Sequence, residues 1–205
     1  MSKTIEWARK IQALAQTGLN YFENPYDRER CEELRELAAE MMASASDAPA
    51  EKWNCVFKNE SGYATPKVDV RGAVFENGKI LLSRELDDGC WSLPGGWADV
   101  NDCPSEAVIR ELREETGYAV RCKKLAAVLD RDKHYKGAAH PFHIYKLMFL
   151  CEHAGKTDEL CHDITDAAFF DIDDLPPLSE HRTLPAHIEM LHLHHLKPDL
   201  PAVFD

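Results

Sequence analysis

The sequence contains no apolar run as long as the roughly 18 residues that a membrane-spanning helix needs. Its first residues, MSKTIEWARK, also lack the apolar stretch of a secretory signal. We therefore expect no membrane partner and a protein that stays in the cytoplasm. The length of 205 residues suits one medium domain, or one domain with a small accessory piece.

Cysteine motifs typical of metal sites or disulfide scaffolds are absent as well. The seven cysteines are scattered and odd in number, and no two of them form a C-x2-C pair. This pattern disfavours both a zinc site and a disulfide framework. We expect reduced thiols.

Basic residues are scarce: 24 Lys and Arg stand against 36 Asp and Glu, which gives a net charge of −12. Nucleic acid is therefore disfavoured as a partner, because binding to a phosphate backbone requires a basic surface. The same charge is unfavourable for a small phosphorylated substrate unless bound metal supplies local positive charge.

Two helices are predicted at the N-terminus. Residues 3–16 carry an apolar stripe and end at Gly18, and residues 27–43 carry another, with Asp27 as N-cap. The small, proline-broken segment 43–50 is typical of a linker. Two short helices cannot bury both stripes alone. They must pack on the main domain or on a second copy of the chain, and we expect a homodimer.

The rest of the chain alternates strands with single helices. Strands are predicted at 68–75, 80–84, 91–93, 125–130, 142–151 and 168–170, and helices at 104–116 and from about residue 184. Asn77-Gly78 predicts a tight hairpin turn between the first two strands, because both residues tolerate positive φ. This order favours an α/β (α+β) fold with a mixed sheet between helices.

The most informative stretch is Trp91–Tyr118, WSLPGGWADVNDCPSEAVIRELREETGY. A glycine-rich loop leads into the helix predicted at 104–116, which starts at a proline and which Gly117 ends. The apolar stripe of this helix, which faces a core, consists of Val108, Ile109 and Leu112.

The neighbouring stripe of the same helix is acidic. Glu111, Glu114 and Glu115 lie together at i, i+3 and i+4. Carboxylates this close repel one another, yet they are the ligands that Mg²⁺ or Mn²⁺ prefers. Arg110 lies one turn before Glu114 and can hold it by a charge-assisted hydrogen bond. A solvated acidic face is the alternative interpretation.

The run R-E-L-x-E-E-x-G, at a fixed interval after a Gly-Gly loop, resembles the Nudix box, G-x5-E-x7-R-E-U-x-E-E-x-G-U with U aliphatic. The matching residues are Gly96, Arg110, Glu111, Leu112, Glu114, Glu115 and Gly117. Asp102 replaces the first Glu, Tyr118 replaces the last aliphatic residue, and Asn101 stands where the loop more usually has Gly. The first Glu is mainly structural in the family, so metal binding is still expected.

Resemblance to this family covers roughly residues 66–200 and implies an α/β/α sandwich. A subset of its bacterial members hydrolyses nucleoside diphosphates linked to another group, X, and carries a helical N-terminal domain. The stretches VDVRGAVF, WSLPGGWADV and FFDIDDLPPLSEHRT are similar to that subset. The expected domains are residues 1–60, a helical domain with linker, and residues 61–205, the Nudix domain.

The resemblance also implies a set of metal ligands and catalytic groups. The expected metal ligands are Glu111, Glu114, Glu115, a backbone carbonyl at Gly95, and Asp99. In the family the general base is often a carboxylate or histidine on a later loop, and sometimes a box glutamate. The catalytic candidates are therefore Glu114, Glu111, Arg110, Glu159 and Asp163, with His162 beside the last two. A solvated acidic loop is the alternative for residues 159–163.

Substrate contacts are expected from cationic and aromatic residues. Arg71 and Arg84 lie on predicted strands, where burying a guanidinium is costly unless it meets an anion; an internal salt bridge is the alternative to phosphate. Lys133 and His134 belong to a short basic patch suited to the second phosphate or to X. Trp97, in the glycine-rich loop, is placed to stack on a base, with core packing as the alternative.

The leading hypothesis is a Nudix hydrolase that uses Mg²⁺ or Mn²⁺ to split a nucleoside diphosphate linked to X into NMP and X-phosphate. ADP-ribose and CDP-choline are the two substrates that the resemblance favours. A (d)NTP pyrophosphohydrolase of the sanitising type is the second hypothesis. A non-catalytic nucleotide-binding Nudix module is the third, although such a module has no need of three clustered carboxylates.

Overall fold

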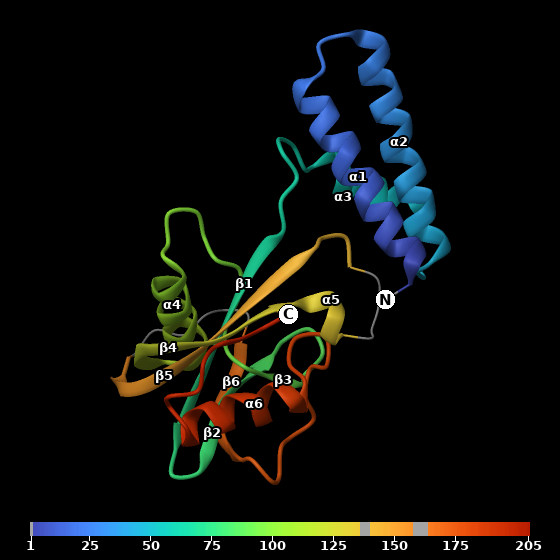
Figure 1. Ribbon diagram of the computed structural model, residues 1–205. Coiled ribbons are helices and arrows are strands. Elements are labelled where there is room, and N and C mark those ends of the chain that lie inside the picture. Colours follow the sequence, from blue (N-terminus) through green and yellow to red (C-terminus); the bar gives the residue numbers. More distant parts are fainter. Residues whose placement is uncertain (1, 136–139, 158–163) are drawn as a thin grey trace. The chain divides into compact units, whose positions relative to one another are not determined.

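Two units make up the chain in the computed structural model, which describes residues 2–135, 140–157 and 164–205 (Figure 1). One unit contains Met1–Lys67 and Asp132–Ile144, and the other contains Val68–Arg131 and Tyr145–Asp205. The division into domains at residue 60 stays a prediction. None of the described helices is long and apolar enough to cross a membrane.

Three helices form most of the N-terminal unit: α1 (Lys3–Tyr21), α2 (Pro25–Ser44) and α3 (Ala50–Lys58). All three contribute to one apolar core, which consists of Ile5, Ala8, Ala38, Ala39, Met42, Trp53 and Phe57. The predicted apolar stripes of the first two helices are therefore largely buried inside the unit, against each other and α3, although Leu34 on α2 remains 41% exposed.

Two predicted helix boundaries are wrong. α1 continues through Gly18 because this glycine serves helix packing: a Cβ there would lie 2.6 Å from the Cys31 Sγ on α2. α2 begins at Pro25 rather than near Asp27, because the Asn24 side chain accepts a hydrogen bond (2.9 Å) from the backbone two residues on. Asn24 is thus the N-cap, and proline occupies the first helical position, where it needs no amide proton.

A seven-stranded sheet forms the second unit. Its strands are β1 (Lys67–Glu76), β2 (Lys79–Glu85), β3 (Trp91–Ser92), β4 (Tyr118–Asp130), β5 (Ile144–Lys156), β6 (Ile164–Asp171) and β7 (Val203–Phe204). Their order is β3-β2-β1-β5-β4-β7, with β6 paired to β2. β7 runs parallel to β4, whereas β1 with β2 and β4 with β5 are antiparallel, so the sheet is mixed, as predicted.

One predicted turn is confirmed, whereas one predicted strand boundary is wrong. The Asn77-Gly78 turn is confirmed, since both residues have positive φ (51° and 78°) between the paired ends of β1 and β2. β4 begins at Tyr118, earlier than predicted. The first half of β4 alternates exposed and more buried side chains instead of forming an apolar run. Pairing with the end of β5 holds this half of the strand in the sheet.

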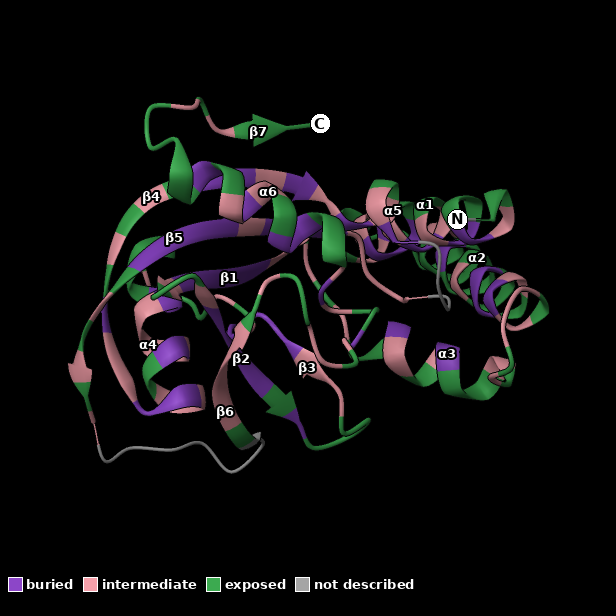
Figure 2. Ribbon diagram, turned by 90° about the horizontal axis from the view of Figure 1, so that it is seen from below, coloured by how far each residue is buried: buried purple, intermediate pink, exposed green. Residues whose placement is uncertain are grey.

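Helices cover both faces of the sheet, α4 (Pro104–Thr116) on one side and α6 (Pro185–Leu196) on the other (Figure 2). Alternate strand residues enter two separate cores: Ala73, Leu82 and Met148 pack with α6, and Val74, Leu81 and Phe149 pack with α4. A short helix, α5 (Arg131–His134), follows β4. The fold is the predicted α/β/α sandwich, preceded in the chain by a helical domain.

Candidate active site

α4 lies close against the sheet because β1 has a glycine beneath it. A Cβ on Gly72 would lie 2.4 Å from the Leu112 Cδ1. Val108 and Leu112 are fully buried and Ile109 packs against the same core, which confirms the predicted apolar stripe. Gly117 ends the helix in the left-handed conformation (φ 68°), also as predicted. Because this packing fixes the rotation of α4 about its axis, it also fixes the direction in which the glutamates of the helix face.

Arg110 is the centre of the acidic cluster. On α4 its guanidinium pairs with Glu111 (2.9 Å) and with Glu114 (3.3 Å), which confirms the predicted contact to Glu114. From the preceding loop, Asp99 and Asp102 each approach the guanidinium to 3.1 Å. One cation thus holds four carboxylates that would otherwise repel one another.

Asp102 and Tyr118, which depart from the Nudix box, and Asn101, which replaces the more usual glycine of the loop, each have a local role. Asp102 reaches Arg110 despite its shorter arm. Asn101 has a φ of 79°, the left-handed conformation that glycine favours and asparagine tolerates. The Tyr118 ring packs edge-on against Phe169, with ring centroids 5.6 Å apart, beside the core under α4. None of the three removes a carboxylate from the cluster on α4.

Glu115 is the most enclosed of the box glutamates. Its Oε2 accepts hydrogen bonds from the Gly95 amide (2.9 Å) and the Ser83 hydroxyl (3.2 Å). Burial raises the pKa of Glu115 to about 7, although the Arg71 charge lowers it, and burial also raises the pKa of Glu111. Since removal from water disfavours the charged forms, a cation bound at these carboxylates would restore them.

The glycine loop lies between β1 and α4. The carbonyls of Pro94 and Gly96 accept hydrogen bonds from β1 amides, and no described group donates one to the Gly95 carbonyl between them. A Cβ on Gly96 would lie 2.8 Å from the Glu111 carboxylate, so the loop and the acidic face of α4 are in contact. The loop therefore has a carbonyl available beside the cluster for a cation that prefers oxygen ligands.

A cavity of about 590 Å³ lies at this cluster, within the size range of small-molecule sites. Its lining consists of Arg71, Glu85, Leu86, Asp87, Gly95, Gly96, Trp97, Asp99, Glu111, Glu115 and Arg182. Acidic groups dominate the wall, and two guanidinium groups accompany them. Trp97 is 47% exposed, so its ring is accessible to a ligand rather than packed in a core.

Arg71 lines this cavity but is paired. Its guanidinium binds both carboxylate oxygens of Asp69 (2.8 and 3.1 Å) and the Leu93 carbonyl (3.0 Å). Lys146 is buried beside Asp69 (3.5 Å) and donates to the Arg182 carbonyl (2.9 Å). Burial lowers the pKa of Lys146 to about 7, although Asp69 opposes this. The internal salt bridge considered for Arg71 is therefore present, in a residue that also reaches the cavity.

Arg182 is a cavity residue that the sequence patterns do not indicate. Its guanidinium pairs with Asp87 (2.9 Å) and Glu85 (3.4 Å) and donates to the Ser179 hydroxyl (3.1 Å). Glu85 and Asp87 precede the box and Arg182 follows it by a long interval, so no short spacing links them. The only sequence signal that includes Arg182 is the similarity of the stretch FFDIDDLPPLSEHRT to relatives.

Five predicted site residues that the structure describes do not line the cavity: Arg84, Arg110, Glu114, Lys133 and His134. Arg84 is exposed on β2, and its Nε donates to the Gly89 carbonyl (2.9 Å). Glu114 lies beside Arg110 with its side chain 36% exposed, outside the lining but within the cluster. The structure thus joins Glu114 to the site through Arg110 and leaves Arg84 separate from the cavity.

The remaining candidates belong to other parts of the chain. Lys133 and His134 lie on α5, among the residues that group with the N-terminal unit. Glu159, His162 and Asp163, the candidates for the general base, lie outside the described residues.

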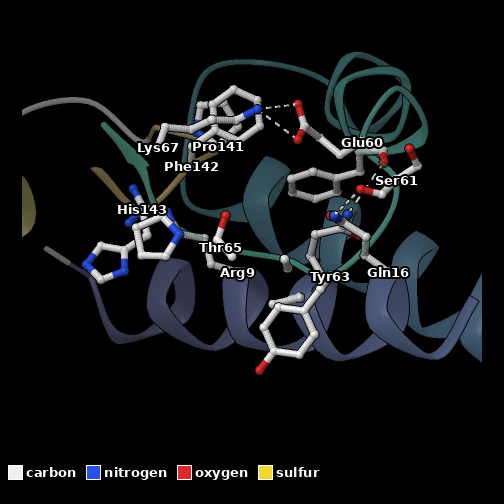
Figure 3. Close-up of a pocket in the computed structure, with 15 residues that line it drawn as sticks. Arg9, Gln16, Glu60, Ser61, Tyr63, Thr65, Lys67, Pro141, Phe142 and His143 are labelled. Atoms are coloured by element: carbon white, nitrogen blue, oxygen red, sulfur yellow. Dashed lines mark hydrogen bonds and ion pairs between the residues drawn. The ribbon is translucent and has the colours of Figure 1, made fainter. Parts of the chain in front are cut away.

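The N-terminal unit contains a cavity of its own, of about 300 Å³ (Figure 3). Polar side chains around it are paired with neighbours: the Lys67 Nζ lies 2.9 Å from the Glu60 carboxylate, and the Gln16 amide donates to the Ser61 carbonyl (3.1 Å). The described residues that line it include no cluster of carboxylates. The cavity at α4 is therefore the better candidate for chemistry on a phosphate anhydride.

Clustered carboxylates at a glycine loop, mounted on the helix of an α/β/α sandwich, define the class of metal-assisted hydrolases of phosphate anhydrides. The chain belongs to the Nudix family: the profile described as the NUDIX domain matches residues 65–193. A second profile, described as the UDP-X-like, N-terminal oligomerisation domain, matches residues 2–57. The protein is a Nudix pyrophosphohydrolase.

Similar proteins include YjhB of Bacillus subtilis (strain 168), which is 44% identical over 204 residues, 100% of this chain and 98% of the relative. Its name assigns it ADP-ribose pyrophosphatase activity provisionally. The crystal structure of a UDP-X diphosphatase has a TM-score of 0.62 and 35% identity, covering 99% of this chain and 98% of that one. An ADP-ribose pyrophosphatase from Streptococcus suis 89-1591 has a TM-score of 0.63 and 33% identity, covering 69% of this chain and 100% of that one.

Proposed function

We propose that this protein hydrolyses the pyrophosphate linkage of a nucleoside diphosphate linked to X, giving NMP and X-phosphate. The observation that carries the proposal is the set of carboxylates gathered by Arg110 beside the glycine loop and the cavity. The names of the similar proteins, ADP-ribose pyrophosphatase and UDP-X diphosphatase, support this substrate class.

The cation in this proposal is Mg²⁺ or Mn²⁺. The ligands would be Glu111, Glu114, Glu115, Asp99 and the Gly95 carbonyl, all of them oxygen donors of the kind these ions prefer. The raised pKa values of Glu111 and Glu115 fit such a site, because burial outweighs the neighbouring guanidinium charges and favours the protonated form, which a bound metal ion would reverse. When bound, the ion neutralises phosphate oxygens and lowers the pKa of a coordinated water.

The protein's own residues supply position and orientation. Arg110 fixes the directions of the carboxylates on α4 and in the loop, so that little reorganisation is needed when substrate binds. Arg71 presents positive charge to the cavity while Asp69 holds its guanidinium in place. The accessible Trp97 ring would stack on the base.

The proposal includes further residues that are not among those described as lining this cavity. Arg84, Lys133 and His134 are proposed as further contacts to phosphate or to X. Glu159 and Asp163 are proposed as candidates for the general base, with a box glutamate as the alternative.

A substrate panel tests the proposed activity. Purified full-length protein is incubated with Mg²⁺ or Mn²⁺ and ADP-ribose, CDP-choline, UDP-sugars and dNTPs, with EDTA-treated samples as controls. We expect a metal-dependent release of NMP from at least one of the linked diphosphates, and no release after metal removal. Pyrophosphate released from dNTPs would instead support the sanitising activity. Tight nucleotide binding with metal present but no turnover would support the non-catalytic module.

We also propose that the protein is a homodimer formed through the N-terminal unit. A stripe of large apolar side chains, Trp7, Leu14 and Tyr21, remains 56–65% exposed along α1. The seven-residue spacing places them on one face of the helix, and the other apolar stripe is buried within the unit. The description of the profile matching residues 2–57, an oligomerisation domain, supports this use of the exposed stripe.

The substitution Leu14→Glu tests the proposed dimer. A charge in the centre of the stripe would be buried without a partner if two copies meet there, so dissociation is expected. Light scattering should give twice 23.3 kDa for the wild type and 23.3 kDa for the variant. Leu193→Glu, at a 45% exposed position on α6, is the matched control and should remain dimeric. A wild-type mass of 23.3 kDa would contradict the proposal.

A further inference from the structure

Two cysteines lie directly opposite each other in the sheet. Cys122 on β4 and Cys151 on β5 are register partners in an antiparallel pair. Side chains at such positions project from the same face of the sheet, with Cα atoms about 4.5–5.5 Å apart. A disulfide requires Cα atoms about 4.4–6.8 Å apart, so the spacing expected of register partners lies within the range of a cross-link.

The two thiols lie on the same face of the sheet, at the core under α4, and differ in environment. A hydrogen bond from the Cys151 thiol lowers the pKa of Cys122 to about 7, and the same contact with burial raises the pKa of Cys151. Cys151 is 8% exposed, whereas Cys122 is only half-buried. Cys122 is therefore the thiol that solvent reaches and the one that becomes a thiolate first, which are the properties of an attacking cysteine.

The location of this pair distinguishes it from the other described cysteines. Both residues belong to the core under α4, Cys151 within it and Cys122 packed against it. The other described cysteines are distributed over separate segments, and no register pairing places any two of them opposite each other. Disulfides in reducing compartments are usually transient and redox-sensing rather than structural. Two free thiols at directly opposite positions in the sheet are suited to that reversible use.

We propose that Cys122 and Cys151 are a redox modification site. Hydroperoxides oxidise the two thiols to a reversible disulfide between Cys122 and Cys151. The Cys122 thiolate attacks the peroxide, the O–O bond breaks, and Cys122 becomes a sulfenic acid, while the leaving hydroxide or alkoxide takes a proton from solvent and departs as water or an alcohol. The Cys151 sulfur then attacks the sulfenic sulfur, an S–S bond forms, and a second water leaves with the Cys151 proton. Two thiols are oxidised and one peroxide is reduced, and a dithiol reverses the reaction.

Intact-mass measurement and peptide mapping test this site. The reduced full-length protein is treated with hydrogen peroxide, quenched with N-ethylmaleimide and digested without reductant. We expect the loss of two hydrogens, a single cross-linked peptide joining Cys122 to Cys151, and recovery of both thiols after dithiothreitol. Cys90→Ser, which removes another half-buried cysteine, should oxidise like the wild type.

Variants of the pair separate the two steps. Cys151→Ser should accumulate a sulfenic acid at Cys122, detected with dimedone, and form at least tenfold less cross-link; Cys151→Ala replaces it if serine unfolds the core. Cys122→Ser should neither cross-link nor label at Cys151. Oxidation of wild-type Cys122 to sulfinic acid without a cross-link, resistance of both thiols to peroxide, or a cross-link to a different cysteine would each overturn the proposal.

Discussion

Replacing Glu114 with Gln is expected to lower kcat about 10²–10³-fold while the protein stays folded. The amide keeps the shape of the side chain but removes a negative charge from the proposed cation site, and metal-derived stabilisation is worth several kcal/mol. Glu114 is the most suitable residue for this test, because its replacement should change the cation site without removing hydrogen bonds that hold the loop. Its carboxylate contacts Arg110 at the surface of α4, whereas Glu115 also accepts hydrogen bonds from Gly95 and Ser83 that hold the loop.

The matched control is Glu106→Gln on the same helix. Glu106 lies in the first turn of α4, where its carboxylate accepts a hydrogen bond from the Cys103 amide (3.1 Å), and glutamine can fill the same capping role. Steady-state kinetics with the best substrate of the panel, at saturating Mg²⁺, should show near-wild-type turnover for Glu106→Gln alone. Calorimetric titration with Mn²⁺ should show weaker binding only for Glu114→Gln. Near-wild-type turnover by Glu114→Gln would refute the metal assignment.

The acidic cluster was predictable because its order is local. Helix geometry alone places Arg110 and Glu114 one turn apart, so their ion pair follows once the helix is recognised. The pair between the adjacent residues Arg110 and Glu111 was not predicted, because neighbours in sequence do not share a helix face. The Asp69–Arg71 pair was also within reach of sequence analysis, since residues two apart on a strand share a face. A charged strand residue considered by itself does not indicate its partner; the pair is recognised only when Asp69 and Arg71 are considered together.

Contacts set by the order of strands could not be predicted in this way. Lys146 meets Asp69 because β5 lies next to β1, and Arg182 meets Asp87 because the chain returns to this part of the sheet long after the box. Neither neighbour relation leaves a spacing signal in a single sequence. The site therefore divides into a helix whose contacts follow from local spacing and a cavity wall whose contacts depend on the order of the strands.

Glycine was the least reliable local signal, because one residue type serves opposite purposes. Gly117 ends α4 in the left-handed conformation, as predicted, whereas Gly18 continues α1 and lets α2 approach. In both cases the sequence shows only a glycine after an apolar periodic segment. The difference lies in whether a second helix occupies the space of the missing Cβ.

Gly95→Ala is expected to be the most damaging single change in the loop. Gly95 has a φ of 141°, and a Cβ there would lie 2.0 Å from the Val70 carbonyl oxygen and 2.9 Å from the Arg71 Cα. These atoms are the backbone of β1, so the collision cannot be relieved by turning a side chain. We expect a loss of more than about 4 kcal/mol in unfolding free energy, or a displaced loop with no activity.

Gly155→Ala separates the collision from the backbone strain. Gly155 has nearly the same φ, 137°, but a Cβ there meets nothing within 4 Å. An alanine at this φ should cost about 1–3 kcal/mol through strain alone. Urea unfolding of both variants, with hydrogen exchange followed in β1, would give the difference between them, which measures the packing of the loop against β1. If both variants unfold at the same urea concentration and both turn over substrate, the close approach at Gly95 is not what holds the loop beside Glu115.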